Sequence, residues 1–210
     1  MKILIIGTPR SGTTSLIKGL GKTKNYQRYG EPWNKYIGDR YPRYPYPYNF
    51  NSECVVKTLI ENIPAEFENL KGLTFSEKLF KFYNELKLDF DRIILLGRKN
   101  LNEQIRSYTY FREKELIDSK VNWHDNYILP DSVDLPTEKF KKEIYRMDDR
   151  LKKLSEILNI DIDWYEELYS GDLDNVKIFV TKHNLDLDLD KFYEYLNPKN
   201  RQRITKLSVI

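Results

Sequence analysis

The feature that most constrains this chain is a short loop joining an apolar run to a helical pattern. The apolar run is Ile3–Ile6, the loop is Gly7–Thr14 (GTPRSGTT), and Leu16, Ile17 and Leu20 follow at helical spacing. Where a strand leads through a tight loop into a helix, backbone N–H groups and the positive end of the helix dipole converge on one point. The sequence therefore predicts a buried first strand, a helix from about residue 12 or 13, and an anion site between them.

The spacing of Gly7 and Gly12 is that of a nucleoside-triphosphate phosphate loop, but the next residue is Thr13, where such a loop has lysine. The loop instead carries Arg10 within its own turn. We interpret this as a site for a less highly charged group than a triphosphate.

Two further apolar runs, Cys54–Val56 and Arg92–Leu96, are typical of buried parallel strands. Helical patterns begin near Leu101 and at Ser76, which we expect to cap its helix. An apolar stripe marks a long amphipathic helix between residues 137 and 158, and shorter elements are predicted at 160–165 (strand), 172–183 and 190–196 (helices). The alternation predicts one domain over residues 1–210, a three-layer α/β/α fold with a mainly parallel central sheet, of the P-loop nucleotide hydrolase type.

Composition excludes several classes of protein. One cysteine, Cys54, excludes an internal disulfide framework, and two histidines leave a Cys/His zinc site without ligands. The 35 basic and 32 acidic residues give a net charge of only +3, which argues against a dedicated nucleic-acid binder. No run approaches the ~20 apolar residues of a membrane span, and the first run is shorter than the ~7–15 residues of an export signal core, so we expect a cytoplasmic protein.

A second set of anion ligands is predicted after the third strand. Arg98 closes that strand, and Ser107 lies in the helix that follows; a guanidinium and a hydroxyl so placed can jointly hold a phosphate. Arg106 is the alternative to Ser107 as the second ligand.

These segments together resemble a known family. Residues 8–14 (TPRSGTT) resemble the 5′-phosphosulfate loop of sulfotransferases that use 3′-phosphoadenosine 5′-phosphosulfate, and Arg98 with Ser107 resembles their 3′-phosphate signature. In the commonest form of that signature the serine stands where this chain has Arg106. The resemblance implies that the sulfuryl donor's 5′ end is held by Arg10, Ser11, Gly12, Thr13 and Thr14, without a metal.

The resemblance extends to the reacting groups. Val56-Lys57-Thr58 resembles the family's Lys-Thr-His segment, but Leu59 occupies the histidine position, so Lys57 is retained as the cation and a histidine base there is excluded. Gly30-Glu31-Pro32 resembles a Gly-Glu-Pro segment of other branches, which makes Glu31 the candidate general base. His124 is the competing candidate.

We therefore expect a sulfotransferase acting on a hydroxyl or amine of a carbohydrate or small molecule, with no nucleic-acid or membrane partner. The alternatives are a P-loop nucleotide or nucleoside kinase and a non-catalytic nucleotide-binding protein of the same fold. The segment 41–50 (YPRYPYPYNF) is a loop that either packs on the core or walls the acceptor pocket; the basic segment 198–203 is expected to be a solvated tail, and residues 164–168 (WYEEL) are expected to be structural.

Overall fold

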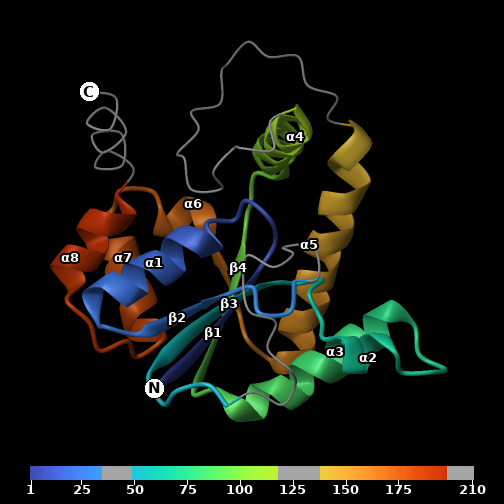
Figure 1. Ribbon diagram of the computed structural model, residues 1–210. Helices are drawn as coiled ribbons and strands as arrows, with labels where there is room; N and C mark the ends of the chain where they lie inside the picture. The colour runs from blue at the N-terminus through green and yellow to red at the C-terminus, as the bar shows by residue number, and fades with distance from the viewer. Residues whose placement is uncertain (35–48, 118–137, 198–210) are drawn as a thin grey trace.

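The computed structural model describes residues 1–34, 49–117 and 138–197 (Figure 1). In these residues five strands form a parallel sheet in the order β2-β3-β1-β4-β5. The strands are β1 (Lys2–Gly7), β2 (Gln27–Gly30), β3 (Cys54–Leu59), β4 (Arg92–Gly97) and β5 (Ile162–Trp164). Parallel pairing brings the carboxyl ends of all five strands to one edge of the sheet.

The register aligns the ends of three strands. Gly7, the last residue of β1, lies opposite Leu59 of β3 and Leu96 of β4. The loop after β1 and the segment after β4 therefore leave the sheet side by side. Gly30, at the end of β2, lies opposite Lys57, so the residue after β2 also starts near the end of β3.

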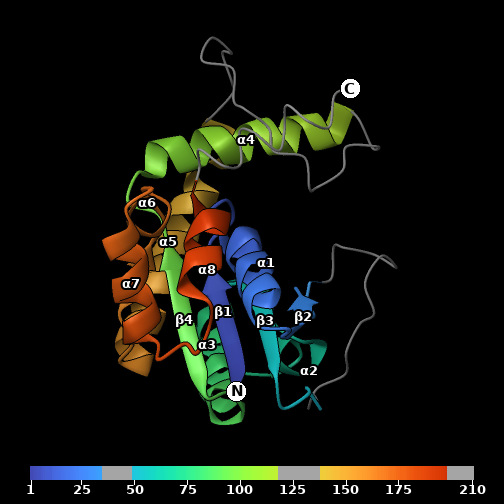
Figure 2. The ribbon, with the colours of Figure 1, turned by 90° about the vertical axis from the view of Figure 1, so that its left-hand side faces the viewer.

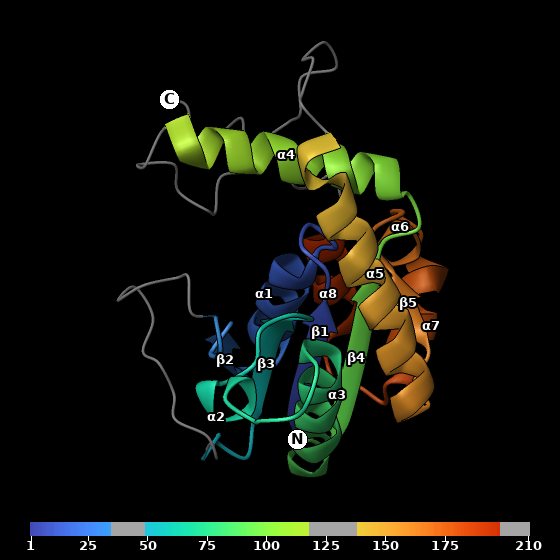
Figure 3. The ribbon, with the colours of Figure 1, turned by 90° about the vertical axis from the view of Figure 1, so that its right-hand side faces the viewer.

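Helices cover both faces of the sheet (Figures 1 and 2). One face carries α1 (Thr13–Thr23), α7 (Leu173–Lys182) and α8 (Leu189–Leu196), together with the short α6 (Tyr165–Leu168). The other carries α2 (Ala65–Glu68), α3 (Phe75–Leu86), the 3-10 turn η2 (Lys87–Asp89) and α5 (Glu138–Leu158). The helix α4 (Leu101–Ile117) crosses above the carboxyl ends of the strands (Figure 3).

The strand residues alternate between two cores. Leu4 and Ile6 of β1 face the α3 and α5 side, where they join buried residues such as Phe82 and Leu151. Ile3 and Ile5 face the α1 and α8 side and join a second cluster that contains Leu16, Leu20 and Phe192. Because both faces of β1 are covered, its sequence is a continuous apolar run with no alternation. The α/β class and the parallel sheet with helices on both sides agree with the prediction.

The structure corrects one detail and adds elements that the patterns did not predict. The cap of α3 is Thr74 and not Ser76: the Thr74 side chain accepts from the Glu77 N–H, and the Glu77 carboxylate accepts from the Thr74 N–H, which is a capping box. The strand β2 was not predicted, and neither were α2, α6 and η2. Of the aromatic segment 41–50, Phe50 is buried against Tyr29, and residues 41–48 lie outside the described part of the chain. No helix in the described residues is long and apolar enough to cross a membrane.

Candidate functional site

Glycine is required at two points of the loop between β1 and α1, at Gly12 by the backbone conformation and the space, and at Gly7 by the space alone. Gly12 has a φ of 87°, and a Cβ there would lie 2.6 Å from the Tyr169 ring and 2.8 Å from the Tyr165 ring. A Cβ at Gly7 would lie 2.5 Å from Thr13 Cγ2. Both positions therefore exclude larger residues for steric reasons. The loop is also closed on itself by the Ser11 hydroxyl, which donates to the Thr8 carbonyl at 2.7 Å.

Arg10 stands at the turn of this loop in a left-handed conformation, with a φ of 63°. Its Nε donates to the Ser107 hydroxyl of α4 at 3.0 Å, and its guanidinium lies 5.4 Å from the centre of the Phe111 ring. Desolvation and, after it, the like charge of Arg98 lower the pKa of Arg10 from its ordinary value. The pair of guanidiniums thus forms a concentrated positive region beside the loop.

Arg98, the first residue after β4, lies on the same side of the sheet as the loop. Its Nη1 donates to the Arg10 carbonyl at 3.4 Å, and its guanidinium stacks on the Tyr165 ring at 4.6 Å. Its Nε is 3.5 Å from Glu166 Oε1, and 15% of its side chain is exposed. The structure therefore brings together the loop, Arg98 and the buried Ser107, which sequence analysis placed at the two ends of one ligand.

Glu166 holds both Arg98 and the start of α4. Its carboxylate accepts from the N–H groups of Lys99 at 2.9 Å and Asn100 at 3.0 Å. Partial burial raises the pKa of Glu166, but the hydrogen bonds from Asn100 and Lys99 and the charge of Arg98 outweigh it, so the net shift is downward. Sequence analysis treated residues 164–168 as structural and missed these contacts. These residues directly follow a predicted strand, and in a parallel sheet that strand ends at the same edge as β1 and β4. This placement could have indicated a contact with Arg98.

Lys57 and Glu31 meet next to the first residues of α1. The Lys57 ammonium group, nearly buried in β3, forms an ion pair with one oxygen of Glu31 and donates to the Thr14 hydroxyl at 3.0 Å. The Asn34 amide donates to the other Glu31 oxygen at 2.5 Å. Glu31 has a φ of 50°, and its N–H donates to the Lys57 carbonyl at 2.7 Å, so backbone and side chain together fix this pair.

The two candidates for the second phosphate ligand, Ser107 and Arg106, lie next to each other on α4. The Ser107 hydroxyl accepts a hydrogen bond from Arg10 of the loop, whereas Arg106 is half-buried. His124 lies outside the described residues, as does the basic segment 198–203. Within the described ranges, no group of three or more His, Cys, Asp or Glu side chains is arranged to hold a metal ion.

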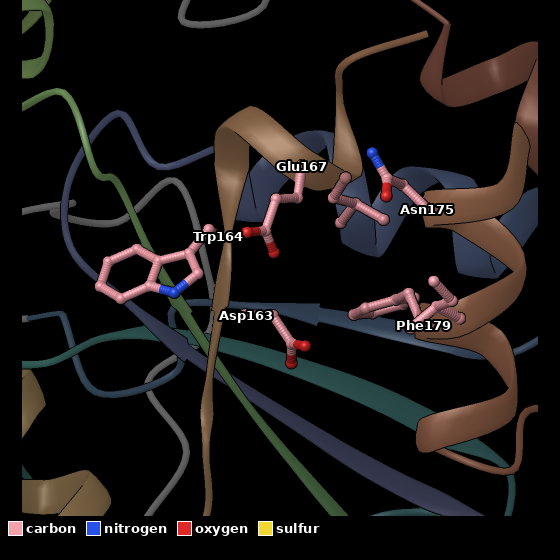
Figure 4. A pocket seen from close by; sticks show the side chains of 7 residues that line it. Asp163, Trp164, Glu167, Asn175 and Phe179 are labelled. Carbon is pink, nitrogen blue, oxygen red and sulfur yellow. The ribbon is translucent and has the colours of Figure 1, made fainter. Parts of the chain in front are cut away.

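A separate hollow of about 290 Å³ lies between the β5–α6 segment and α7 (Figure 4). Asp163 and Glu167 line one side of it, and Asn175 and Phe179 line the other. The polar groups here already have partners inside the protein. Asp163 binds Lys182 at 2.8 Å and the His183 ring at 2.7 Å, Glu167 binds Lys99 at 2.5 Å, and Asn175 donates to Ser170 at 3.2 Å.

Comparison of this chain with models of known protein families, with curated proteins and with solved structures found no match. The fold and the site together define an α/β protein in which Arg10, Lys57 and Arg98 converge at the carboxyl edge of a parallel sheet.

Proposed function

We propose that the protein is a sulfotransferase that moves a sulfuryl group from 3′-phosphoadenosine 5′-phosphosulfate to a hydroxyl or amine acceptor. The observation that carries the proposal is the convergence of Arg98 and Ser107 on the loop that follows β1, although they lie 88 and 97 residues after Arg10 in the sequence. A glycine-rich loop before a helix is suited to one anion, and a guanidinium with a hydroxyl is suited to another. Two such groups on one side of a sheet match a ligand with an anionic group at each end.

The donor fits the charge of the loop better than a nucleoside triphosphate does. Thr13 stands where a triphosphate site has its lysine, and the cations are supplied by Arg10 within the loop and by Lys57 from β3. In the proposed complex, the N–H groups of residues 12–14 bind the 5′ phosphosulfate, while Ser11 shapes the loop because its N–H and its hydroxyl both donate to the Thr8 carbonyl. Arg98 and Ser107 bind the 3′-phosphate.

The transfer step breaks the bond between sulfur and the oxygen that bridges it to phosphorus. A new bond forms between sulfur and the acceptor oxygen or nitrogen, the acceptor's proton passes to Glu31, and the bridging oxygen leaves as part of adenosine 3′,5′-bisphosphate. Lys57 and Arg10 stabilise the negative charge that develops on that oxygen. The P-loop architecture is part of the same proposal.

The transfer step requires that the ion pair between Lys57 and Glu31 be broken first, because the carboxylate has to accept a proton. A carboxylate held by Lys57 on one oxygen and Asn34 on the other is oriented toward the end of β3. We propose that Lys57 turns to the donor's bridging oxygen when the donor binds, while remaining next to Thr14. Glu31 is then released from the ammonium group and can accept the proton from the acceptor.

Calorimetry tests the nucleotide assignment. Titration with adenosine 3′,5′-bisphosphate, ADP and ATP should give the tightest binding for the first, and Arg98→Ala should abolish that preference. Because charged hydrogen bonds are each worth about 1.5–3 kcal/mol, the expected loss of affinity is at least about tenfold. Lys99→Ala is the matched control, since it removes a neighbouring cation that pairs with Glu167. Equal binding of all three ligands to the native protein would refute the assignment.

The same titration separates the proposal from the two alternatives. Preference for ATP, with turnover that requires Mg²⁺, would indicate a kinase. Preference for adenosine 3′,5′-bisphosphate, with no sulfuryl transfer to any member of a broad acceptor panel, would indicate a binding protein that has no catalytic activity.

A further inference from the structure

Gln104 of α4 is completely buried and contacts the anion loop directly. Its Nε2 donates to the Thr8 hydroxyl at 2.7 Å and to the Pro9 carbonyl at 2.6 Å. Because a carbonyl can only accept, the Pro9 contact requires the NH₂ group on this side of the amide and fixes its orientation. The loop is therefore held from above by a side chain of the helix that crosses the sheet edge (Figure 3).

The oxygen of the Gln104 amide shows that burying this side chain costs free energy. Among the described residues, Gln104 Oε1 has no hydrogen-bond partner, although it is buried. A buried acceptor without a partner is unfavourable, and an apolar residue of the same size would avoid this cost. Packing alone does not explain a glutamine at this position, whereas two hydrogen bonds to the loop do.

The contacts of Gln104 belong to a series along one segment. Gln104 holds the Pro9 carbonyl, Arg98 holds the Arg10 carbonyl, and Ser107 holds the Arg10 side chain. The peptide groups on both sides of Arg10 are thus fixed by residues of the β4–α4 segment. This matters because Arg10 has a φ of 63°, a conformation that is unfavourable for a residue with a Cβ and persists only when its surroundings impose it.

We infer that Gln104 is a positioning residue that holds the anion loop in its binding conformation and so ties the 5′ end of the site to the helix that carries Ser107. This inference rests on the proposed function for the identity of the ligand. Gln104 itself does not contact the reacting atoms. It acts through Pro9 and Arg10.

The test compares Gln104→Met, which keeps the size of the side chain and removes its donors, with Asn102→Ala, an exposed amide on the same helix. Titrations use adenosine 5′-phosphate and adenosine 3′-phosphate as separate probes. Loss of two hydrogen bonds that fix the loop should lower the affinity for the 5′-phosphate roughly tenfold in Gln104→Met. The affinity for the 3′-phosphate should change less than twofold, and Asn102→Ala should change neither. Equal losses for both nucleotides, or no loss for either, would overturn the inference.

A second measurement does not depend on any nucleotide. Hydrogen exchange of the ligand-free protein should be faster at the amides of residues 11–14 in Gln104→Met than in the native protein, with exchange in β3 unchanged. Unchanged exchange in the loop would overturn the inference. If Gln104→Met does not fold, Gln104→Leu, which also has no donor and introduces no charge, serves in both measurements. A native protein that does not prefer 3′-phosphorylated ligands refutes the proposed function, and loop exchange still decides the role of Gln104.

Discussion

Two regions of the molecule combine charged and aromatic side chains, and they differ in how the charges are balanced. At the carboxyl edge of the sheet, three separate segments bring Arg10, Arg98 and Lys57 to one loop. Lys57 pairs with Glu31 and Arg98 lies 3.5 Å from Glu166, whereas Arg10 donates to the Ser107 hydroxyl and lies beside the like charge of Arg98. In the hollow between β5–α6 and α7, Asp163 and Glu167 are each matched by basic groups of the protein itself. In the first region, burial and, after it, the like charge of Arg98 lower the pKa of Arg10. The second is held together by its own ion pairs.

The proposed function assigns the anionic ligand to the first region. A buried guanidinium beside a second guanidinium costs free energy, and an anion bound at the loop would offset that cost. In the hollow, the acidic groups are matched by basic groups of the protein itself, so no ligand is needed to balance them. The following predictions test this distinction, from the largest expected effect to the smallest.

The largest effect is expected for Glu31→Gln at the loop edge. If Glu31 accepts the acceptor's proton, turnover should fall about 10²–10⁴-fold, measured as sulfuryl transfer at saturating donor. Affinity for adenosine 3′,5′-bisphosphate should change little, because the amide keeps the side chain's shape. Glu53→Gln, an exposed carboxylate next to β3, is the control. A rate near that of the native protein would direct attention to His124.

Gly12→Ala should damage the loop itself. At a φ of 87° an alanine is strained, and its Cβ meets the Tyr169 and Tyr165 rings, so the free energy of unfolding should fall by about 1–3 kcal/mol and nucleotide affinity should fall with it. Gly72→Ala is a matched control, since Gly72 has a φ of 78° but open space around its Cβ. Denaturant unfolding and calorimetry measure the two effects. A smaller loss in Gly12→Ala than in Gly72→Ala would contradict the steric argument.

Asp163→Asn tests the hollow between β5–α6 and α7, where the charges are paired within the protein. Removing the charge shared by Lys182 and the buried His183 should lower the free energy of unfolding by about 1 kcal/mol, while nucleotide affinity stays within twofold of the native value. Asp161→Asn, an exposed carboxylate two residues earlier, should have no effect on either. A large loss of nucleotide affinity in Asp163→Asn would mean that the hollow belongs to the binding site after all.

Glu166→Gln tests how the carboxylate that binds Arg98 and the start of α4 affects stability as a function of pH. The pKa of Glu166 is lower in the folded protein, so its stabilising effect is present above the unfolded-state pKa of about 4.3 and is lost as pH falls through the folded value. The native protein should therefore exceed Glu166→Gln in stability above about pH 5, and the difference should shrink below about pH 4. Melting temperatures of both proteins across pH 3–7 measure this. Glu167→Gln is the control, and a difference that grows toward acid pH would contradict the assigned direction.

Much of the fold was predictable because its signals are local. The buried runs of β1, β3 and β4 and the apolar stripe of α5 are visible in the sequence without knowledge of their neighbours. The strand β2 was missed because only Tyr29 of its four residues is buried, which leaves no apolar run to detect. Two hydroxyl residues, Thr74 and Ser76, could each cap α3. Thr74 is the cap because the Glu77 side chain lies three residues after it and completes a capping box.

The site was partly predictable for the same reason. The loop, Arg98 and Lys57 each directly follow or end an apolar run, so their meeting at one edge follows from parallel strands. The pairing of Glu31 with Lys57 depends on β2 lying next to β3, which the sequence does not state. Gln104 has no pattern around it, and its hydrogen bonds to Thr8 and Pro9 depend on the position of α4 above the loop.

The position of β1 in the middle of the sheet has a consequence for the order of folding. Lys2 pairs with Cys54 and Ile3 pairs with Arg92, so the two neighbours of β1 come from segments about fifty and about ninety residues further along the chain. Such long-range pairing is slow to form. The glycine turn at the end of β1 is completed by residues that lie further along still, since Gln104 binds the Pro9 carbonyl and the Tyr169 hydroxyl donates to the Gly12 carbonyl. A refolding chain therefore has to assemble the sheet before this turn reaches its final shape.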